Sequence, residues 1–180
     1  NYREFVDDVM FVVPWYAQSV IFYKHKMQKI KGDIVEGILM DLPVNVGACS
    51  YWAVKPLKNI IPFASWDNVY IWDGYQLYQI GDQVAGYFKW RELYLSTIAM
   101  GFCKDAIYIA CKDKTGTPTY NNVALRYYIL TKSWTILPSW NVNVWSNWDQ
   151  KDDLNDFYYG DSVTGNIYSM NSLIYRFDTT

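Results

Sequence analysis

The sequence predicts an all-β protein. Aromatic residues make up 19% of the 180 residues and hydrophobic residues 51%, and aromatic side chains favour strands. Short apolar runs alternate with turn signals instead of forming long helical patterns. The strongest turn signal is Asp73-Gly74, which separates the runs 69–72 and 75–80 and predicts a hairpin with positive φ at both turn residues.

Strand–turn–strand units recur along the chain, which indicates a repeat. Their centres fall near Ile21, Tyr70, Tyr108 and Tyr158, at intervals of about 40–50 residues, the length of a four-stranded propeller blade. We therefore expect a β-propeller-like array of about four antiparallel blades, either a single all-β domain over 1–180 or a fragment of a larger propeller. A β-sandwich of short strands is the alternative. The expected units cover 18–44, 45–82, 95–138 and 139–177.

The first half of the chain accounts for two of these units. Residues 1–17 mix helical and strand spacing, and we interpret them as a connecting segment, although 10–13 would also serve as a buried strand before Pro14. Turns are expected at Lys24-His25, Gly32-Asp33 and Lys58-Asn59. The expected strands are 19–23, 27–31 and 34–40 in the first unit, and 51–54, 59–64, 69–72 and 75–80 in the second.

In the second half, residues 83–95 break strict alternation and favour a short helical turn near 87–93. The polar segment 112–122 predicts a protruding loop, because it contains Gly116 and Pro118. Expected strands are 97–102, 106–111, 123–130 and 134–137, followed in the last unit by 139–148, 156–161, 166–170 and 173–177.

The net charge and the short apolar runs argue against nucleic acid and membranes as partners. The net charge of −2 provides no general attraction to nucleic acid or an anionic membrane. The longest apolar run, 9–15, is too short to span a bilayer. We interpret the single basic cluster as edge lysines that prevent strand-to-strand aggregation. It consists of Lys24, Lys26, Lys29 and Lys31, with His25 among them.

The residues give no catalytic, cofactor or metal site. His25 is the only histidine, and its flanking lysines favour an exposed position, unlike a catalytic imidazole. The three cysteines lack zinc-site spacing and are expected to be buried free thiols: Cys49, Cys103 and Cys111. We interpret one acidic stretch as a solvated turn, and a weak calcium site is the alternative. Its acidic residues are Asp149, Asp152, Asp153 and Asp156.

Two regions of the chain, 18–82 and 156–170, resemble a known group of proteins. The segment 19–30, followed by Asn45-Val46-Gly47 and by 59–74, is similar to the β-propeller regions of tailed-bacteriophage virion proteins of the tail hub, nozzle and adaptor type. The closing hairpin from Tyr159-Gly160-Asp161 to Tyr168 is also like their last blade. The resemblance rests on hairpin glycines, turn aspartates and strand hydrophobics. It implies a structural role in a symmetric virion assembly, without enzymatic activity or a cofactor.

We therefore expect a structural phage-tail component that is assembled in the host cytoplasm, oligomeric, and in contact with other virion tail proteins. Trp140, Trp145 and Trp148 are the expected interface residues, because tryptophan is frequent at interface hot spots, although packing between blades is their alternative. A carbohydrate- or receptor-binding propeller that contacts a host surface glycan is the second hypothesis. A propeller glycosidase is the third, because paired carboxylates can come from different strands.

Overall fold

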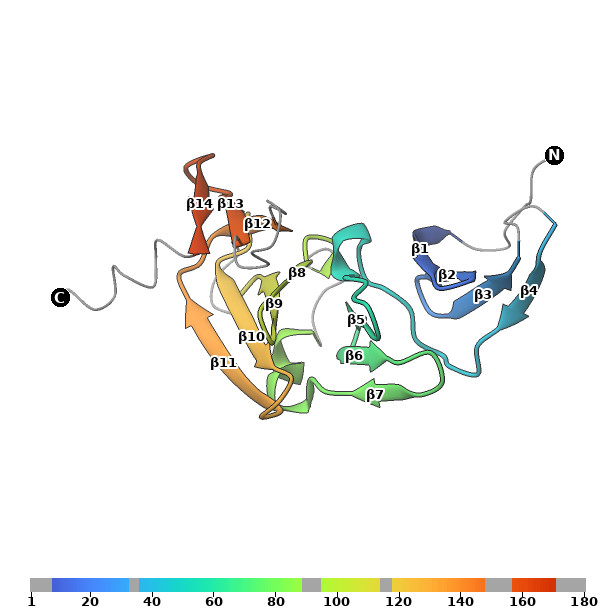
Figure 1. The fold of residues 1–180 in the computed structure, drawn as a ribbon. Helices are drawn as coiled ribbons and strands as arrows, with labels where there is room; N and C mark the ends of the chain where they lie inside the picture. Colours follow the sequence, from blue (N-terminus) through green and yellow to red (C-terminus); the bar gives the residue numbers. More distant parts are fainter. Residues whose placement is uncertain (1–7, 33–35, 89–94, 114–117, 148–156, 171–180) are drawn as a thin grey trace.

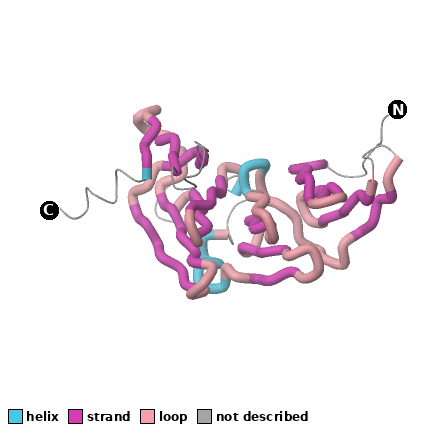
Figure 2. Tube along the Cα trace, viewed as in Figure 1, coloured by secondary structure: helices cyan, strands magenta, loops and turns pink. Residues whose placement is uncertain are grey.

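The structure is a computed structural model, and it describes residues 8–32, 36–88, 95–113, 118–147 and 157–170. The described residues are built mainly of strands, with short 3-10 helices between them (Figure 2). The strands form four separate antiparallel sheets, so the all-β prediction is confirmed. A sandwich of two sheets is not what these strands form.

Each sheet is a meander in which strands pair with their sequence neighbours. The first sheet contains β1 (Val9–Trp15), β2 (Gln18–Tyr23), β3 (Met27–Lys31) and β4 (Ile38–Asp41), and the second contains β5 (Ile61–Ala64), β6 (Val69–Trp72) and β7 (Leu77–Gln79). The third contains β8 (Ala99–Cys103), β9 (Ala106–Cys111), β10 (Val123–Tyr128) and β11 (Ser133–Pro138), and the fourth contains β12 (Val142–Asn147), β13 (Phe157–Asp161) and β14 (Ile167–Ser169).

The four sheets follow one another in chain order along a curved row, with the first and fourth sheets at its opposite ends (Figure 1). Each pair of neighbouring sheets encloses an apolar cluster, so every sheet contributes to a core only by packing on its neighbour. Short strands with both faces covered explain why β5, β6 and β9 are buried along their whole length.

Aromatic side chains dominate the core between the first and second sheets. Phe22 of β2 meets Phe63 of β5 with ring centroids 5.0 Å apart, and Trp15 of β1 meets Trp72 of β6 at 5.8 Å. These rings bury large areas and pack in edge-to-face or tilted arrangements that aromatic pairs favour. The core between the second and third sheets is more aliphatic and includes Ile107, Ile109 and Leu125.

The third and fourth sheets approach each other closely at Gly101 of β8. A Cβ on Gly101 would lie 2.5 Å from the Cβ of Trp145 and 2.7 Å from Cζ of Phe157, so no larger residue fits without movement. Trp145 stacks on Phe157 at 5.1 Å with the rings 3° from parallel, and its indole N–H donates to the Ala99 carbonyl at 3.2 Å. Glycine therefore allows this aromatic pair to lie against β8.

Two predictions for the first half of the chain differ from the structure. Residues 9–15 are not a connecting segment: the alternative of a strand at 10–13 is confirmed, because β1 covers these residues and pairs with β2 from Val9↔Tyr23 to Trp15↔Gln18. Residues 51–54 are not a strand: Tyr51–Ala53 form a 3-10 helix, and only Val54 bridges to Phe63. The chain runs beside β5 on both sides of this turn, because the backbone N–H groups of Cys49 and Lys55 donate to the carbonyls of Ala64 and Pro62.

The Asp73-Gly74 hairpin exists, but its turn differs from the predicted one. The last strand pair is Trp72↔Leu77, so the connection contains four residues, and only Gly74 has a positive φ, of 98°. The Asp73 carboxylate accepts hydrogen bonds from the backbone N–H groups of Tyr75 and Gln76 at 2.8 and 2.7 Å. This side-chain turn replaces the second positive φ.

Most of the helical turn expected at 87–93 lies outside the described residues, and a described helix comes just before it. Asp82–Tyr87 form a 3-10 helix, which places Val84 and Phe88 in the core between the second and third sheets. Residues 89–94 lie outside the described residues, as do the expected strand at 173–177 and the acidic stretch around 149–156.

Candidate binding groove between the first two sheets

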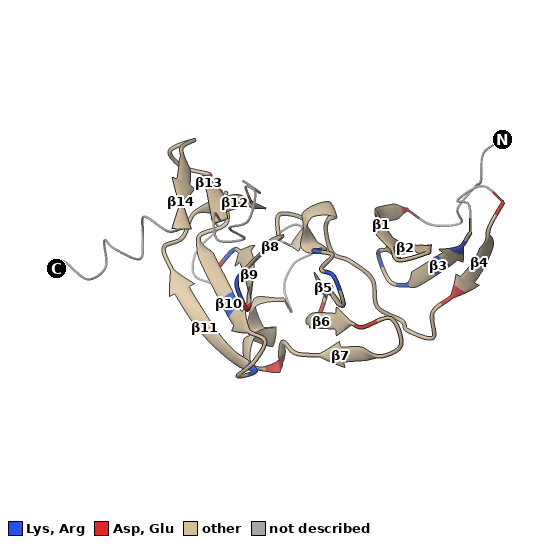
Figure 3. Ribbon diagram, viewed as in Figure 1, with Lys and Arg blue, Asp and Glu red and all other residues tan. Residues whose placement is uncertain are grey.

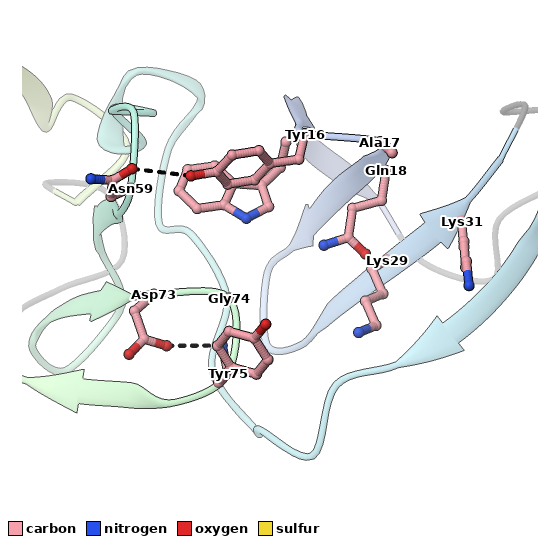
Figure 4. Close-up of a pocket in the computed structure, with 10 residues that line it drawn as sticks. Tyr16, Ala17, Gln18, Lys29, Lys31, Asn59, Asp73, Gly74 and Tyr75 are labelled. Atoms are coloured by element: carbon pink, nitrogen blue, oxygen red, sulfur yellow. Dashed lines mark hydrogen bonds between the residues drawn. The ribbon is translucent and has the colours of Figure 1, made fainter.

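A groove of about 630 Å³ lies between the first and second sheets, where three turns come together. These are the β1–β2 turn at Tyr16-Ala17, the turn at Asn59 and the β6–β7 turn at 73–76. The groove falls in the size range typical of small-molecule sites. Its residues come from both sheets and project into the same space (Figure 4).

The floor of the groove is Trp15, at the end of β1. Trp15 is 5% exposed and packs on Trp72, so the groove is the solvent end of the aromatic core between these sheets. A Cβ on Gly74 would lie 3.5 Å from Nε1 of Trp15, which places the indole N–H beside the β6–β7 turn. No described residue accepts a hydrogen bond from it, so this donor is available to a ligand.

Tyr16 forms one wall. It sits in the two-residue β1–β2 turn with a φ of 53°, a conformation that costs energy for a bulky residue. Its ring meets Trp15 edge-on at 5.2 Å, and its hydroxyl donates to Oδ1 of Asn59 at 3.0 Å (Figure 4). This hydrogen bond links the first sheet to the turn before the second, yet 76% of Tyr16 stays exposed.

Tyr75 forms the opposite wall at the tip of the β6–β7 turn. It is 95% exposed, because Gly74 and the Asp73 side chain hold the turn so that the ring extends into solvent. The backbone N–H groups of Gln76 and Tyr75 lower the pKa of Asp73 below its ordinary value. Asp73 also accepts a hydrogen bond from the Tyr78 hydroxyl at 3.0 Å. The hydrogen bonds of its carboxylate are thus made with residues of its own hairpin.

Lys29 and Lys31 supply the positive charge of the groove. They lie on the same face of β3 as Met27, which packs in the core toward the second sheet. The interpretation of these two lysines as edge residues is wrong, because β3 is an inner strand between β2 and β4. Within the described part of the chain neither lysine makes an ion pair. Charged residues elsewhere are scattered over the sheets (Figure 3).

The other two lysines of the basic cluster contact aromatic rings. The Nζ atoms of Lys24 and Lys26 each lie 4.7 Å from a ring centroid, that of Trp66 and that of Tyr23. Such cation–π contacts stabilise the hairpin. His25 between them is exposed and lies 5.9 Å from the Trp66 ring, as expected for a turn residue.

The groove has the chemistry of a binding site. Of the residues that line it only Asp73 is acidic, whereas acid–base hydrolysis of a glycoside requires two carboxyl groups. Two ammonium groups, two exposed phenol rings, an indole N–H and the amides of Gln18 and Asn59 instead form a set of donors and stacking surfaces. This set can hold a polar, flat or ring-shaped ligand.

The predicted interface tryptophans lie apart from this groove. Trp145 is 6% exposed between the third and fourth sheets, so its contacts lie within the chain. Trp140 is partly buried and stacks on Tyr159, with centroids 5.5 Å apart. Trp148 falls outside the described residues. An interface role for these tryptophans stays a prediction, and Trp140 is the described one with a partly open surface.

The prediction for the cysteines is confirmed, because all three are free and buried: Cys49, Cys103 and Cys111. Burial raises the pKa of each thiol, so none resembles a reactive nucleophile. Among the described residues no three histidine, cysteine or acidic side chains cluster as a metal site would require. The described chain also has no helix that is long and apolar enough to cross a membrane.

Sequence reasoning missed the groove residues Tyr16, Asn59 and Tyr75. Asn59 and Tyr75 lie in or beside predicted turns, which was the available signal, whereas Tyr16 belonged to the segment interpreted as a connection. Nothing in the sequence indicated that three turns so far apart along the chain would meet.

The chain matches no protein-family model, and no curated protein is significantly similar to it in sequence. Several solved structures resemble its fold. One is the crystal structure of the computationally designed Ika4 protein, with a TM-score of 0.55, 15% sequence identity and coverage of 94% of each chain. At this identity the likeness concerns the arrangement of the chain alone. The chain thus has an all-β fold of successive antiparallel sheets that is shared with a designed protein.

Proposed function

We propose that the protein is a propeller-like array of four blades that serves as a rigid structural component of a phage tail. The four consecutive meanders, each packed face to face on the next, support the propeller-like arrangement. The phage assignment rests on the sequence resemblance described above. In this proposal the protein is not an enzyme. Its role is structural, and it binds other tail proteins in the virion.

The observation that carries an assembly role is the outer face of the last sheet. Phe157 and Tyr159 of β13 point toward the third sheet, so the alternating positions Tyr158 and Gly160 face outward. The residues that pair with these two on β12 and β14 face outward too. These four residues carry no formal charge: Val144, Ser146, Ile167 and Ser169. Ile167 is 77% exposed and Val144 is 40% exposed.

The occupant that we propose for this face is a second copy of the chain. Symmetric assemblies repeat one interface between identical subunits, and a charge-free sheet face can pack on another sheet as the inner faces do. Apolar groups gathered on one exposed sheet face are typical of interaction sites.

The test compares two lysine substitutions at equally exposed apolar residues. Ile167→Lys places a charge on the proposed contact, whereas Leu130→Lys, at a residue that is also 77% exposed, places it on the β10–β11 turn. Sedimentation velocity over a concentration series should show self-association of the wild type and of Leu130→Lys, and monomers for Ile167→Lys. A wild-type chain that stays monomeric at high concentration would refute this contact.

A second candidate function is carbohydrate binding, and the groove between the first two sheets favours it. Two exposed tyrosine rings on opposite walls are suited to stacking on sugar rings, and the surrounding amides and indole are suited to hydroxyl groups. Titration of the purified chain with neutral and acidic saccharides tests this function independently of self-association.

A further inference from the structure

We propose that the groove between the first two sheets selects an acidic saccharide, meaning a sugar ring that carries a carboxylate. The inference rests on the second function proposed above, carbohydrate binding, and adds the chemical class of the ligand. It follows from three properties of the groove: an excess of positive charge, two exposed aromatic side chains and a set of neutral donors.

The charge comes from Lys29 and Lys31. They are two residues apart on one strand, so both ammonium groups reach the groove side of the first sheet (Figure 4). The single acidic residue of the lining, Asp73, already accepts two backbone hydrogen bonds and one from Tyr78. Asp73 stays ionised and offsets part of this charge, but two ammonium groups against one carboxylate leave the lining positive on balance. A ligand carboxylate is therefore attracted to the lysine side of the groove, and ammonium–carboxylate hydrogen bonds are among the stronger ones.

The aromatic walls favour a sugar as the body of this ligand. Tyr16 and Tyr75 expose their rings above and below one another in Figure 4, with both lysines to one side of them, and the two residues are 76% and 95% exposed. The C–H face of a pyranose packs on such a ring, while its hydroxyl groups remain free for hydrogen bonds. The hydrogen bond from Tyr16 to Asn59 limits the movement of one wall before any ligand binds.

The neutral donors suit hydroxyl groups. The Trp15 indole N–H lies beside Gly74 on the floor, and the amides of Gln18 and Asn59 can both donate and accept. A volume of about 630 Å³ accommodates a ligand of one or two sugar rings.

Other anionic ligands fit less well. Nucleic acids bind through many phosphate contacts, whereas this groove offers two cations on a chain with a net charge of −2. An acidic peptide would use the lysines but leave the two ring faces without a matching flat partner. The saccharide is the class that uses all three properties.

The experiment is calorimetric titration of the chain with two matched pairs of saccharides, sialyllactose against lactose and digalacturonate against galactobiose. The two acidic probes differ in where the carboxylate sits: sialyllactose carries one, on its terminal sugar, whereas digalacturonate carries one on each of its two rings. At least one of them should bind about tenfold or more tightly than its neutral partner, as expected for charge-assisted hydrogen bonds. That preference should weaken as salt is added.

Variants assign the binding to the groove. Lys29→Met with Lys31→Met should remove the preference for the acidic sugar and leave weak neutral binding, and Tyr75→Ala should weaken both. The matched controls, Lys104→Met and Tyr120→Ala, change exposed residues outside the groove and should behave as the wild type. Thermal melts of each variant show whether the fold is retained.

The outcomes separate the two proposals. Equal affinity for acidic and neutral sugars overturns the acidic preference but leaves carbohydrate binding in place. An absence of binding by all four saccharides overturns both, without bearing on the scaffold function. Hexaglutamate that binds as tightly as digalacturonate would overturn the assignment to a saccharide.

Discussion

Gly101→Ala tests the close contact between the third and fourth sheets. The added Cβ would lie 2.5 Å from the Cβ of Trp145, and 2.7 Å from both its Cγ and Cζ of Phe157. The Cβ of Trp145 is fixed to the backbone of β12, so no side-chain rotation relieves the first contact. The strands β8 and β12 must move apart, which loosens the stacked Trp145–Phe157 pair.

Two effects of this substitution oppose each other. Gly101 does not have a positive φ, so its backbone accepts alanine, and replacing glycine stabilises a compatible site by about 0.4–1 kcal/mol. Overpacking of a well-packed core costs about 1–3 kcal/mol. With three contacts below 3.0 Å we expect the upper half of that range, and a net loss of about 1–2 kcal/mol.

Urea unfolding at equilibrium, followed by tryptophan fluorescence, measures this loss. In a chain of this length it should also lower Tm by about 2–8 °C. The control is Gly160→Ala on the outer face of β13, where the new Cβ would lie 3.0 Å from Cγ1 of Val144, a side-chain end that can rotate away. If Gly101→Ala unfolds at the same urea concentration as the wild type, the two sheets do not pack as the structure has them.

Three further predictions concern the same cores. Trp145→Ala should destabilise the chain by about 3–5 kcal/mol, and Trp140→Ala by clearly less, because only the first ring is fully enclosed; urea unfolding of both variants measures the difference. Burial and the hydrogen bond to Asp67 raise the pKa of Tyr70 to about 12, whereas an unfolded tyrosine ionises near 10.0. The stability that Tyr70 contributes is therefore complete below pH 10 and lost as the pH rises through 12, so Tm should fall less over this interval in Tyr70→Phe than in the wild type. In the native chain Ellman's reagent should react slowly with every thiol at pH 8, and rapidly once urea unfolds the chain, because burial raises the pKa of all three: Cys49, Cys103 and Cys111. Rapid reaction before unfolding would contradict the buried positions.

The strands were the most predictable part of the fold. The expected strands at 69–72 and 106–111 coincide with β6 and β9. Short runs of β-prone residues between turn residues form strands because of the conformational preferences of those residues themselves. The error at 51–54 has a different origin. Tyr51–Ala53 is apolar enough for a strand, but Ser50 bonds to the Ile98 carbonyl at 2.6 Å, and the chain turns there into the second sheet.

The groove could not be predicted to the same degree. Lys29 and Lys31 belonged to a recognised basic cluster, but whether β3 lies at an edge or inside a sheet depends on β4 pairing with it. The meeting of Tyr16 with Asn59 joins residues 43 positions apart, and no local pattern reports such a contact.

The all-β character and the positions of most strands and turns follow from the sequence alone, because they depend on side-chain preferences over a few neighbouring residues. The tertiary structure decided which aromatic rings are enclosed and which are exposed. Trp145 and Tyr75 are both aromatic and both flanked by turn or strand residues, yet one is 6% exposed and the other 95%. The physical reason is that burial depends on how one sheet packs on the next, and that packing joins residues distant in the chain.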